Sequence, residues 1–170
     1  VAALAMEEAS RKRGTGATRM PKVLVTGGAG YIGAHCCVAL IEAGLEPVIL
    51  DNLSNAHAGV VDRIERIAGA RPEFVRADVR DEAALDAVFA GHEIASVIHF
   101  AALKAVGESV AKPLDYFDNN VHGSLRLFSA MRRAGVRTLV FSSSATVYGD
   151  PASVPVAENF PLGVTNPYGR

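Results

Sequence analysis

Short apolar runs alternate along the chain with longer segments in which apolar residues recur every three or four positions. The runs are apolar at consecutive positions, which is typical of parallel strands buried on both faces. They predict strands over 22–26, 47–50, 73–77, 96–100 and 138–141. The segments between them have the spacing of amphipathic helices that pack on a sheet. They predict helices over 31–43, around 60–67, around 85–89 and over 114–134.

Strands that alternate with helices are joined by right-handed crossovers and form a parallel sheet. The 170 residues suffice for one domain with a hydrophobic core. We therefore expect an α/β fold, a doubly wound parallel sheet of the Rossmann type, over residues 21–170. Residues 1–20 are different: they are basic and turn-rich around 10–16 and have no sustained apolar face. We expect a disordered N-terminal extension there.

The helix over 31–43 has an apolar face with helical period, which comprises Ile32, Cys36, Ala39 and Leu40. The next helix, around 60–67, carries the apolar residues Val60, Val61, Ile64 and Ile67.

Three glycines follow the first predicted strand at regular spacing: Gly27, Gly30 and Gly33. Gly27 permits a sharp turn, Gly30 permits the backbone to approach a pyrophosphate, and Gly33 permits close packing of the helix. The N–H groups at the start of that helix favour a phosphate. Asp51 closes the second strand, where an acidic residue binds the adenosine ribose in this fold. The pattern predicts a dinucleotide site; the alternative is a glycine-rich turn without a ligand.

Ligands of open parallel sheets bind beyond the carboxyl ends of the strands. The residues expected there are 27–33, 51–52, 78–79, 100–102 and 142–146. The Asp51 carboxylate accepts hydrogen bonds from ribose hydroxyls but repels a 2′-phosphate, and no arginine stands beside it. We therefore expect NAD rather than NADP. Asp78 has two candidate roles, capping the next helix or contacting adenine, and the sequence leaves both open.

Composition and charge argue against several classes of function. A net charge of −1 provides no basic surface for nucleic acid or an anionic membrane, and no apolar run is long enough to span a bilayer. We expect no nucleic-acid or membrane partner. The five histidines lack metal-ligand spacing, so we expect no metal site. Cys36 and Cys37 are adjacent on a predicted helix, which is poor geometry for a disulfide and favours free thiols in the cytoplasm.

Several longer segments carry a resemblance to a known family. They read VLVTGGAGYIG, VILDNLSN, VIHFAALKAVGESV, DNNVHGSLRL, FSSSATVYGD and NPYG. With these segments the chain resembles the extended short-chain dehydrogenase/reductase family, and within it the enzymes that epimerise UDP-hexoses at C4. The resemblance implies NAD as cofactor and Tyr168 as the catalytic base, with the hydroxyls of Ser144 and Thr146 beside it. It also implies the following cofactor-binding residues: Gly27, Gly30, Tyr31, Ile32, Gly33, Asp51, Asn52, Leu53, Ser54, Asn55, Ala56, Asp78, Val79, Phe100, Ala101, Ala102, Leu103, Lys104, Asn119 and Ser142.

The reaction implied by the resemblance is a redox epimerisation of UDP-galactose or UDP-glucose. Hydride leaves C4 for NAD while Tyr168 removes the proton of the 4-hydroxyl, and the 4-keto sugar then takes the hydride back on its other face. Free tyrosine has a pKa near 10, so this base requires a preference of about 4 kcal/mol for the phenolate near neutral pH. The family supplies part of it with a lysine four residues after the tyrosine, a position beyond Arg170.

We therefore expect an N-terminal fragment of a longer parent, incomplete at its C-terminal end, without the sugar-binding domain and inactive alone. The resemblance implies a homodimeric parent with two interface helices per subunit; only the first, around 114–134, is present, which argues against dimerisation of the fragment. The alternatives are another nucleotide-sugar epimerase, a 4,6-dehydratase of the same family, or a non-catalytic NAD-binding remnant. Dehydratases place Asp-Glu where this chain has Ala145-Thr146, which disfavours elimination.

Overall fold

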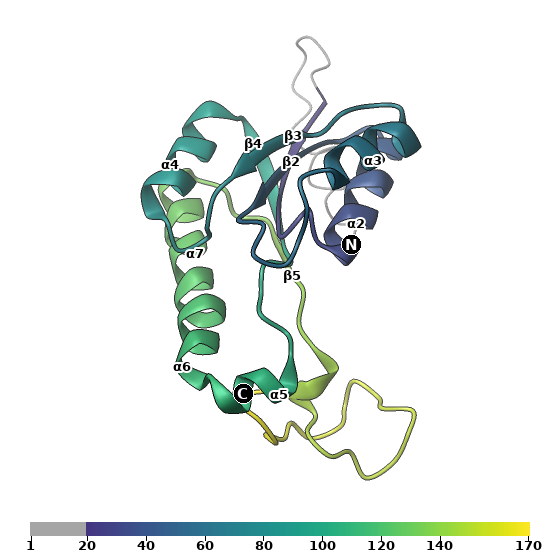
Figure 1. The fold of residues 1–170 in the computed structure, drawn as a ribbon, viewed down its shortest axis with the longest axis vertical. Coiled ribbons are helices and arrows are strands. Elements are labelled where there is room, and N and C mark those ends of the chain that lie inside the picture. Colours follow the sequence, from purple (N-terminus) through teal and green to yellow (C-terminus); the bar gives the residue numbers. More distant parts are fainter. Residues whose placement is uncertain (1–19) are drawn as a thin grey trace.

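Five parallel strands form one sheet at the centre of the protein in a computed structural model, which describes residues 20–170 (Figure 1). Their order is β3-β2-β1-β4-β5. Their bounds are β1 Lys22–Thr26, β2 Glu46–Asp51, β3 Glu73–Arg76, β4 Ile94–His99 and β5 Leu139–Phe141. The predicted doubly wound parallel sheet is thereby confirmed. The predicted extension over 1–20 falls on residues 1–19, outside the described residues, except for Met20.

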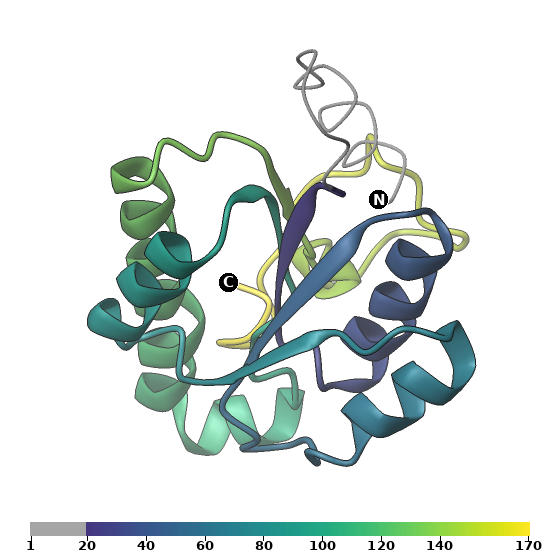
Figure 2. The same ribbon diagram turned by 90° about the horizontal axis from the view of Figure 1, so that it is seen from above.

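Helices cover both faces of the sheet (Figure 2). The helical elements are α2 Tyr31–Glu42, α3 Val60–Ala68, α4 Glu82–Gly91, α5 Val106–Ala111, α6 Pro113–Tyr116, the π-helix η1 Phe117–His122, α7 Gly123–Arg133 and the 3₁₀ turn η2 Ala145–Val147. Helices α2 and α3 lie on one face, and α4 and α7 lie on the other. This is the two-sided cover that a right-handed doubly wound sheet requires.

The core consists of two apolar layers, one on each face of the sheet, because successive side chains of a strand point to opposite faces. In β1, Leu24 packs with Leu85 and Leu127 of the α4 and α7 layer. Its neighbours Val23 and Val25 pack in the α2 and α3 layer. All three β1 residues are fully buried. The sheet is therefore held from both sides, which fixes the positions of its carboxyl ends.

The predicted apolar face of α2 is right at Leu40 and, in part, at Cys36, which packs against the same core layer, but it is wrong at Ile32 and Ala39. The buried residues are Gly33, Cys37 and Leu40, whereas Ile32 is 51 % exposed and Ala39 lies on the surface. The reason is the close approach of Gly33 to the preceding turn, which rotates the packed face away from Ile32.

The apolar residues of α3 divide between the core and the surface. Val61 and Ile64 are buried, and Val60 packs against their layer. Ile67 is 68 % exposed, because it lies one turn beyond the part of α3 that reaches the sheet.

The predicted long helix over 114–134 is a continuous rod of α6, η1 and α7 (Figure 1). Its middle is π-helical, a feature that often occurs at functional sites and that no sequence pattern predicted here. Helix α5 was also not predicted: it is six residues long, contains Gly107 and has no side-chain N-cap. Pro113 then opens α6, because proline fits the first turn of a helix but not its interior.

Within residues 20–170, no helix is long and apolar enough to cross a bilayer. The same residues contain no group of three or more side chains placed to hold a metal ion, and Cys36 and Cys37 are free thiols.

Candidate functional site

The loops that follow the first four strands open into one cleft of about 760 Å³. It brings together all of the predicted cofactor residues except Leu53, Asp78 and Ser142. These are Gly27, Gly30, Tyr31, Ile32, Gly33, Asp51, Asn52, Ser54, Asn55, Ala56, Val79, Phe100, Ala101, Ala102, Leu103, Lys104 and Asn119. Of the three others, Leu53 donates its backbone N–H to the Asp51 side chain, and Asp78 accepts a hydrogen bond from Asn52. Ser142 donates its N–H to the carbonyl oxygen of His99, the residue before Phe100.

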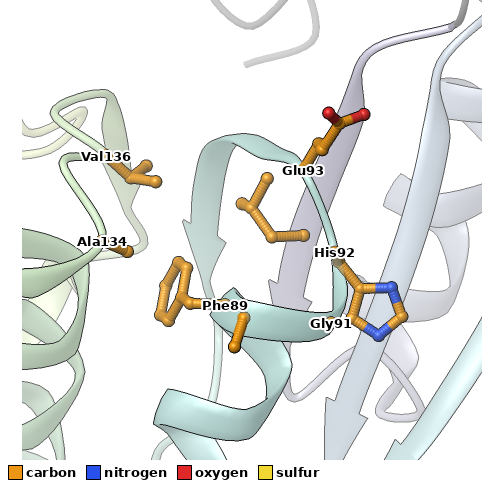
Figure 3. Close-up of a pocket in the computed structure, with 8 residues that line it drawn as sticks. Phe89, Gly91, His92, Glu93, Ala134 and Val136 are labelled. Carbon is orange, nitrogen blue, oxygen red and sulfur yellow. The ribbon is translucent and has the colours of Figure 1, made fainter.

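A smaller pocket of about 260 Å³ lies elsewhere, between the end of α4, the start of β4 and the segment after α7 (Figure 3). Phe89, His92 and Val136 are among its lining residues. It adjoins the amino end of β4, whereas the cleft lies at the carboxyl ends of the strands. None of the predicted site residues lines it.

The turn after β1 depends on Gly27. Its φ of +68° is a left-handed conformation that glycine adopts without strain. A Cβ at Gly27 would lie 2.7 Å from the backbone nitrogen of Ala101, so the turn passes in contact with the loop after β4. A Cβ at Gly33 would overlap the carbonyl oxygen of Gly27. Gly33 was expected to let the helix pack closely on the sheet; its close contact is instead with the glycine turn.

The N-terminus of α2 faces this cleft without a competing acceptor. Its N-cap is Gly30, which makes no side-chain cap, and no acidic residue lies in the first turn. The N–H groups of this turn and the positive end of the helix dipole are therefore available to an anion. Among the lining residues Tyr31 and Ile32 belong to this turn. The arrangement is suited to a phosphate or pyrophosphate group.

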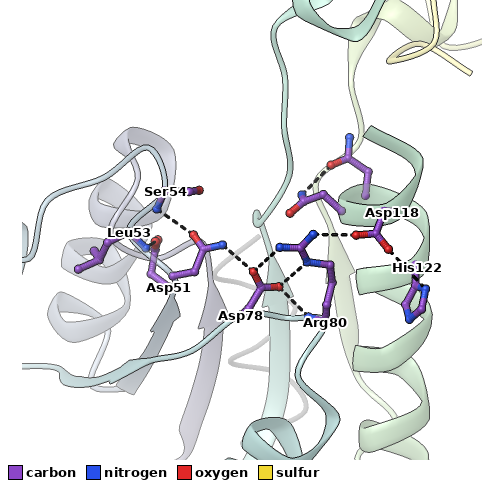
Figure 4. A network of polar contacts seen from close by, with 10 residues as sticks. Asp51, Leu53, Ser54, Asp78, Arg80, Asp118 and His122 are labelled. Atoms are coloured by element: carbon purple, nitrogen blue, oxygen red, sulfur yellow. Dashed lines mark hydrogen bonds and ion pairs between the residues drawn. The ribbon is translucent and has the colours of Figure 1, made fainter. Parts of the chain in front are cut away.

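Asp51 holds its carboxylate in a fixed position at the end of β2 (Figure 4). The side chain accepts hydrogen bonds from the backbone N–H groups of Ala29, at 3.1 Å, and Leu53, at 2.8 Å. These bonds use one acceptor position on each oxygen and leave one on each for another donor. Asp51 is 8 % exposed and lines the cleft, so the remaining positions suit two neighbouring hydroxyl groups of a ligand.

Asp78 does not cap α4, and that candidate role was wrong. The N-cap of α4 is Asp81, whose side chain accepts a hydrogen bond from the N–H of Ala84 at 3.0 Å. Asp78 instead forms an ion pair with Arg80 and accepts a hydrogen bond from Asn52 (Figure 4). The Arg80 guanidinium holds the pKa of the Asp78 carboxyl well below its usual range, so this group is ionised at neutral pH.

His99 ends β4 in a buried chain of hydrogen bonds. Its Nδ1 lies 2.6 Å from the Thr26 hydroxyl and its Nε2 lies 2.9 Å from the Ser124 hydroxyl. The Ser124 hydroxyl donates to the carbonyl oxygen of Asn120. A hydroxyl has one proton, so we assign Nε2 as the donor to Ser124 and Nδ1 as the acceptor from Thr26. Burial, and more weakly Lys104, lowers the pKa of His99 to about 4, so the ring is neutral.

The Asn120 side chain extends this chain to the loop after β4. It accepts a hydrogen bond from the N–H of Leu103 at 2.8 Å and donates to the Leu103 carbonyl at 2.9 Å. Leu103 and Asn119 both line the cleft. The π-helical segment therefore fixes one wall of the cleft through two hydrogen bonds between the Asn120 side chain and the Leu103 backbone.

None of the three predicted catalytic residues lines the cleft, but Ser144 and Thr146 are in contact and the segment that carries Tyr168 lies beside them. The Thr146 hydroxyl donates to the Ser144 hydroxyl over 2.9 Å. A Cβ at Gly169 would lie 2.8 Å from the Thr146 carbonyl oxygen, so the segment that carries Tyr168 packs directly on η2. The Tyr168 ring is edge-on to Tyr116, with ring centroids 6.4 Å apart. Tyr116 lines the cleft, which places Tyr168 at that end of it.

Sequence reasoning missed the residues that close this end of the cleft. Tyr116 and Glu108 line it. The Tyr116 hydroxyl accepts a hydrogen bond from the Ala105 N–H, and its single proton has two acceptors within reach, the Ala105 carbonyl oxygen at 2.8 Å and the Glu108 carboxylate at 3.0 Å. Ser109 accepts a hydrogen bond from the N–H of Tyr168 at 3.3 Å. Except for Tyr168, these residues belong to α5, α6 or the loop before them. An apolar residue pattern offers no signal for such polar contacts between distant segments.

A parallel sheet in this order, with a glycine turn after β1 and a carboxylate that closes β2, defines the Rossmann class of dinucleotide-binding folds. Within that class, residues 24–170 match the model of the GDP-mannose 4,6 dehydratase family. The chain belongs to this family.

The named relatives are UDP-glucose 4-epimerases. That of Yersinia pestis is 59% identical over 149 residues, which are 87% of this chain and 44% of the relative. The crystal structure of the enzyme from Stenotrophomonas maltophila with bound NAD and formylated UDP-arabinopyranose is 55% identical, with a TM-score of 0.85 over 89% of this chain and 45% of that one. That of Bifidobacterium longum with NAD+ and UDP is 48% identical, with a TM-score of 0.85 over 87% and 44%. The chain thus spans less than half the length of these proteins.

Proposed function

We propose that the cleft binds NAD and that the chain supplies the cofactor-binding half of an enzyme that epimerises a UDP-hexose at C4. The observation that carries this proposal is the pairing of Asp51 with the uncapped N-terminus of α2 in one cleft. The two free acceptor positions of Asp51 suit the 2′- and 3′-hydroxyls of an adenosine ribose, and the α2 N–H groups suit the pyrophosphate. The residues present therefore fit NAD.

The catalytic part of the proposal assigns roles to three side chains. Tyr168 removes the proton from the sugar 4-hydroxyl, and the Ser144 hydroxyl relays that proton. Thr146, whose hydroxyl donates a hydrogen bond to that of Ser144, is the second hydroxyl in reach of the sugar 4-oxygen. NAD, when bound, supplies reversible hydride transfer at C4. Support comes from the contact of Gly169 with Thr146 and from the UDP-glucose 4-epimerases to which the chain is similar. The natural substrate class is then a UDP-hexose.

A 4,6-dehydratase is the rival within this family, and the family model takes its description from such an enzyme. Elimination of water from the sugar requires an acid and a base next to the 4-ketone. The positions concerned are Ala145 and Thr146 in η2, and neither side chain is a carboxylic acid. This absence of an acid pair at η2 favours epimerisation.

The NAD assignment is tested by titrating the chain with NAD and NADP and repeating both titrations with Asp51→Asn. We expect the unaltered chain to prefer NAD, and Asp51→Asn to weaken NAD binding about tenfold or more, because a charged acceptor is lost. NADP should be affected less, because the repulsion of its 2′-phosphate is also removed. Asp62→Asn, on the surface of α3, is the matched control. Equal binding of NAD by the Asp51 variant and the unaltered chain would contradict the ribose contact.

Two further parts of the proposal concern assembly and location. We propose a homodimer, because the rod of α6, η1 and α7 exposes a line of apolar side chains at Leu114, Phe117, Val121, Leu125 and Phe128. We propose the cytoplasm, a reducing compartment, because Cys36 and Cys37 are free thiols on one helix. A UDP-sugar is the proposed small-molecule partner.

A further inference from the structure

Asp78 lies just outside the cleft, but the residues before and after it in the chain, Ala77 and Val79, line the cleft, and so does its hydrogen-bond partner Asn52. Its carboxylate accepts four hydrogen bonds: from the backbone N–H, Nε and Nη2 of Arg80, at 2.9, 2.9 and 2.8 Å, and from Nδ2 of Asn52 at 2.9 Å. A carboxylate has about four acceptor positions in its plane. All of them are therefore in use, three by one charged residue and one by a neutral amide.

Arg80 also reaches across to the rod on the other side. Its Nη1 donates to Oδ2 of Asp118 in η1 at 2.7 Å, while Nε and Nη2 hold Asp78 (Figure 4). Asp118 precedes Asn119, which lines the cleft, and Asp78 precedes Val79, which also lines it. One planar guanidinium thus connects the loop after β3 to the π-helical segment. The five donors of arginine in a fixed fork allow this; a lysine ammonium cannot hold the same geometry.

Val79 is fixed between the same two segments. It is 4 % exposed, and a Cβ at Gly123, the first residue of α7, would lie 2.8 Å from Cγ2 of Val79. The Arg80 stem lies beside the same position, 3.5 Å from it. The absence of a side chain at Gly123 therefore lets the rod approach Val79 closely. Packing and the guanidinium bridge hold the loop from two directions.

Single exposed ion pairs contribute little to stability, but bidentate arginine–carboxylate pairs in a network are the exception. The side chains of Arg80, Asp78 and Asp118 are 41%, 24% and 51% exposed. Such a cluster serves geometry more than stability. Its effect is to set where Asp78 and Val79 stand relative to the cleft.

We propose that Arg80 is a positioning residue for the adenine end of the cleft, an inference that rests on the proposed binding of NAD. Arg80 occupies three acceptor positions of Asp78 and orients the fourth toward Asn52, a cleft-lining residue. The Asn52 amide holds the place that the amino group of adenine takes when the dinucleotide binds. When the adenine amino group replaces the Asn52 amide, one N–H donor on the Asp78 carboxylate replaces another. All four acceptor positions of Asp78 are therefore occupied both with and without the dinucleotide.

The test compares NAD with nicotinamide hypoxanthine dinucleotide, which has an oxygen in place of the adenine amino group. Dissociation constants for both are measured with the 170-residue chain, with Arg80→Lys and with Arg133→Lys. The last variant alters a similar exposed arginine of α7, paired with Asp86 and Glu82, away from the cleft. We expect the unaltered chain and Arg133→Lys to prefer NAD about tenfold, the magnitude of one hydrogen bond to a charged group. In Arg80→Lys the ratio of the two dissociation constants should fall to near one, because this change weakens the binding of NAD and leaves that of the hypoxanthine dinucleotide unchanged.

The ratio of the two dissociation constants separates positioning from loss of fold, because general destabilisation weakens both ligands together. Asp118→Asn, an exposed change that removes one arm of the bridge, should lower the ratio less than Arg80→Lys. Asn52→Ala should keep or raise the ratio, because the acceptor position of Asp78 that Asn52 occupies is then open to adenine. An unchanged ratio in Arg80→Lys, or a ratio near one in the unaltered chain, would overturn the positioning role. No binding of either dinucleotide would overturn the proposed function itself, and this inference with it.

Discussion

At the scale of single residues, the ends of the strands contain buried polar groups whose hydrogen bonds are nearly all satisfied. His99 is the clearest case, since it is 3 % exposed and both of its ring nitrogens are hydrogen-bonded. A protonated ring has two donors and no acceptor, so it cannot keep the bond that Thr26 donates. The protein therefore tolerates only the neutral form of this residue, which ties the stability of the fold to pH.

The free energy of unfolding should consequently fall on acidification through this residue. The folded pKa of about 4 lies below the ordinary value of 6.5, so the unfolded chain binds the proton first. The contribution of His99 is fully present above about pH 6.5, falls between pH 6.5 and 4, and amounts to about 3 kcal/mol. Denaturant unfolding at a series of pH values measures it. In His99→Gln this pH-dependent part should vanish, whereas the exposed His57→Gln should retain it; equal profiles for His99→Gln and the unaltered chain would contradict the assignment.

At the scale of elements, α2 is fixed by its contact with the glycine turn as well as by its buried residues Cys37 and Leu40. Gly33→Ala places a methyl group against the carbonyl oxygen of Gly27. Because Gly27 directly follows β1, this backbone cannot move away without disturbing the strand. Overpacking of this kind costs about 1–3 kcal/mol, or roughly 3–10 °C in Tm for a chain of this size. Gly91→Ala in α4 is the control, since nothing lies within 4 Å of its Cβ position, and it should leave Tm unchanged or slightly higher. Thermal unfolding followed by circular dichroism compares them. Similar Tm values for the two variants would show that α2 can shift to accept the methyl group.

The same elements show how far the sequence alone predicts the molecule. The glycine turn and Asp51 were predictable because both belong to one strand–helix–strand unit, in which the glycines follow the first strand and the carboxylate closes the second. The register of α2 was not, because it depends on contact between Gly33 and the backbone of the preceding turn. Helix α5 and the π-helix were missed because their polar contacts join residues far apart for a periodic pattern: Tyr116 with Ala105, 11 positions apart, and Asn120 with Leu103, 17 positions apart. The role of Arg80 depends on Asp118, 38 residues away, and leaves no periodic signal.

At the scale of the whole molecule, the rod of α6, η1 and α7 leaves a surface that the described chain does not cover. Leu114, Val121 and Leu125 are 79%, 51% and 58% exposed, and with Phe117 and Phe128 they recur every three or four residues. A line of apolar side chains at this spacing lies on one face of a helix and is typical of helix–helix packing. In a two-fold dimer the same line on a second copy would cover it, because such an interface uses one surface twice.

This assembly predicts that the chain self-associates and that acidic residues on the line prevent it. In the double variant Val121→Glu, Leu125→Glu, two carboxylates from each copy would meet at a two-fold interface, where burying unpaired like charges is strongly unfavourable. We expect the dimer dissociation constant to rise at least tenfold. Sedimentation velocity over a range of concentrations measures it. Ile67→Glu is the matched control, because Ile67 is an equally exposed apolar residue at 68 % but lies on α3, away from the rod. A chain that stays monomeric at high concentration would contradict the dimer, and so would a double variant that associates as tightly as the unaltered protein. Loss of association in both variants would point to nonspecific contact between apolar surfaces instead of the rod.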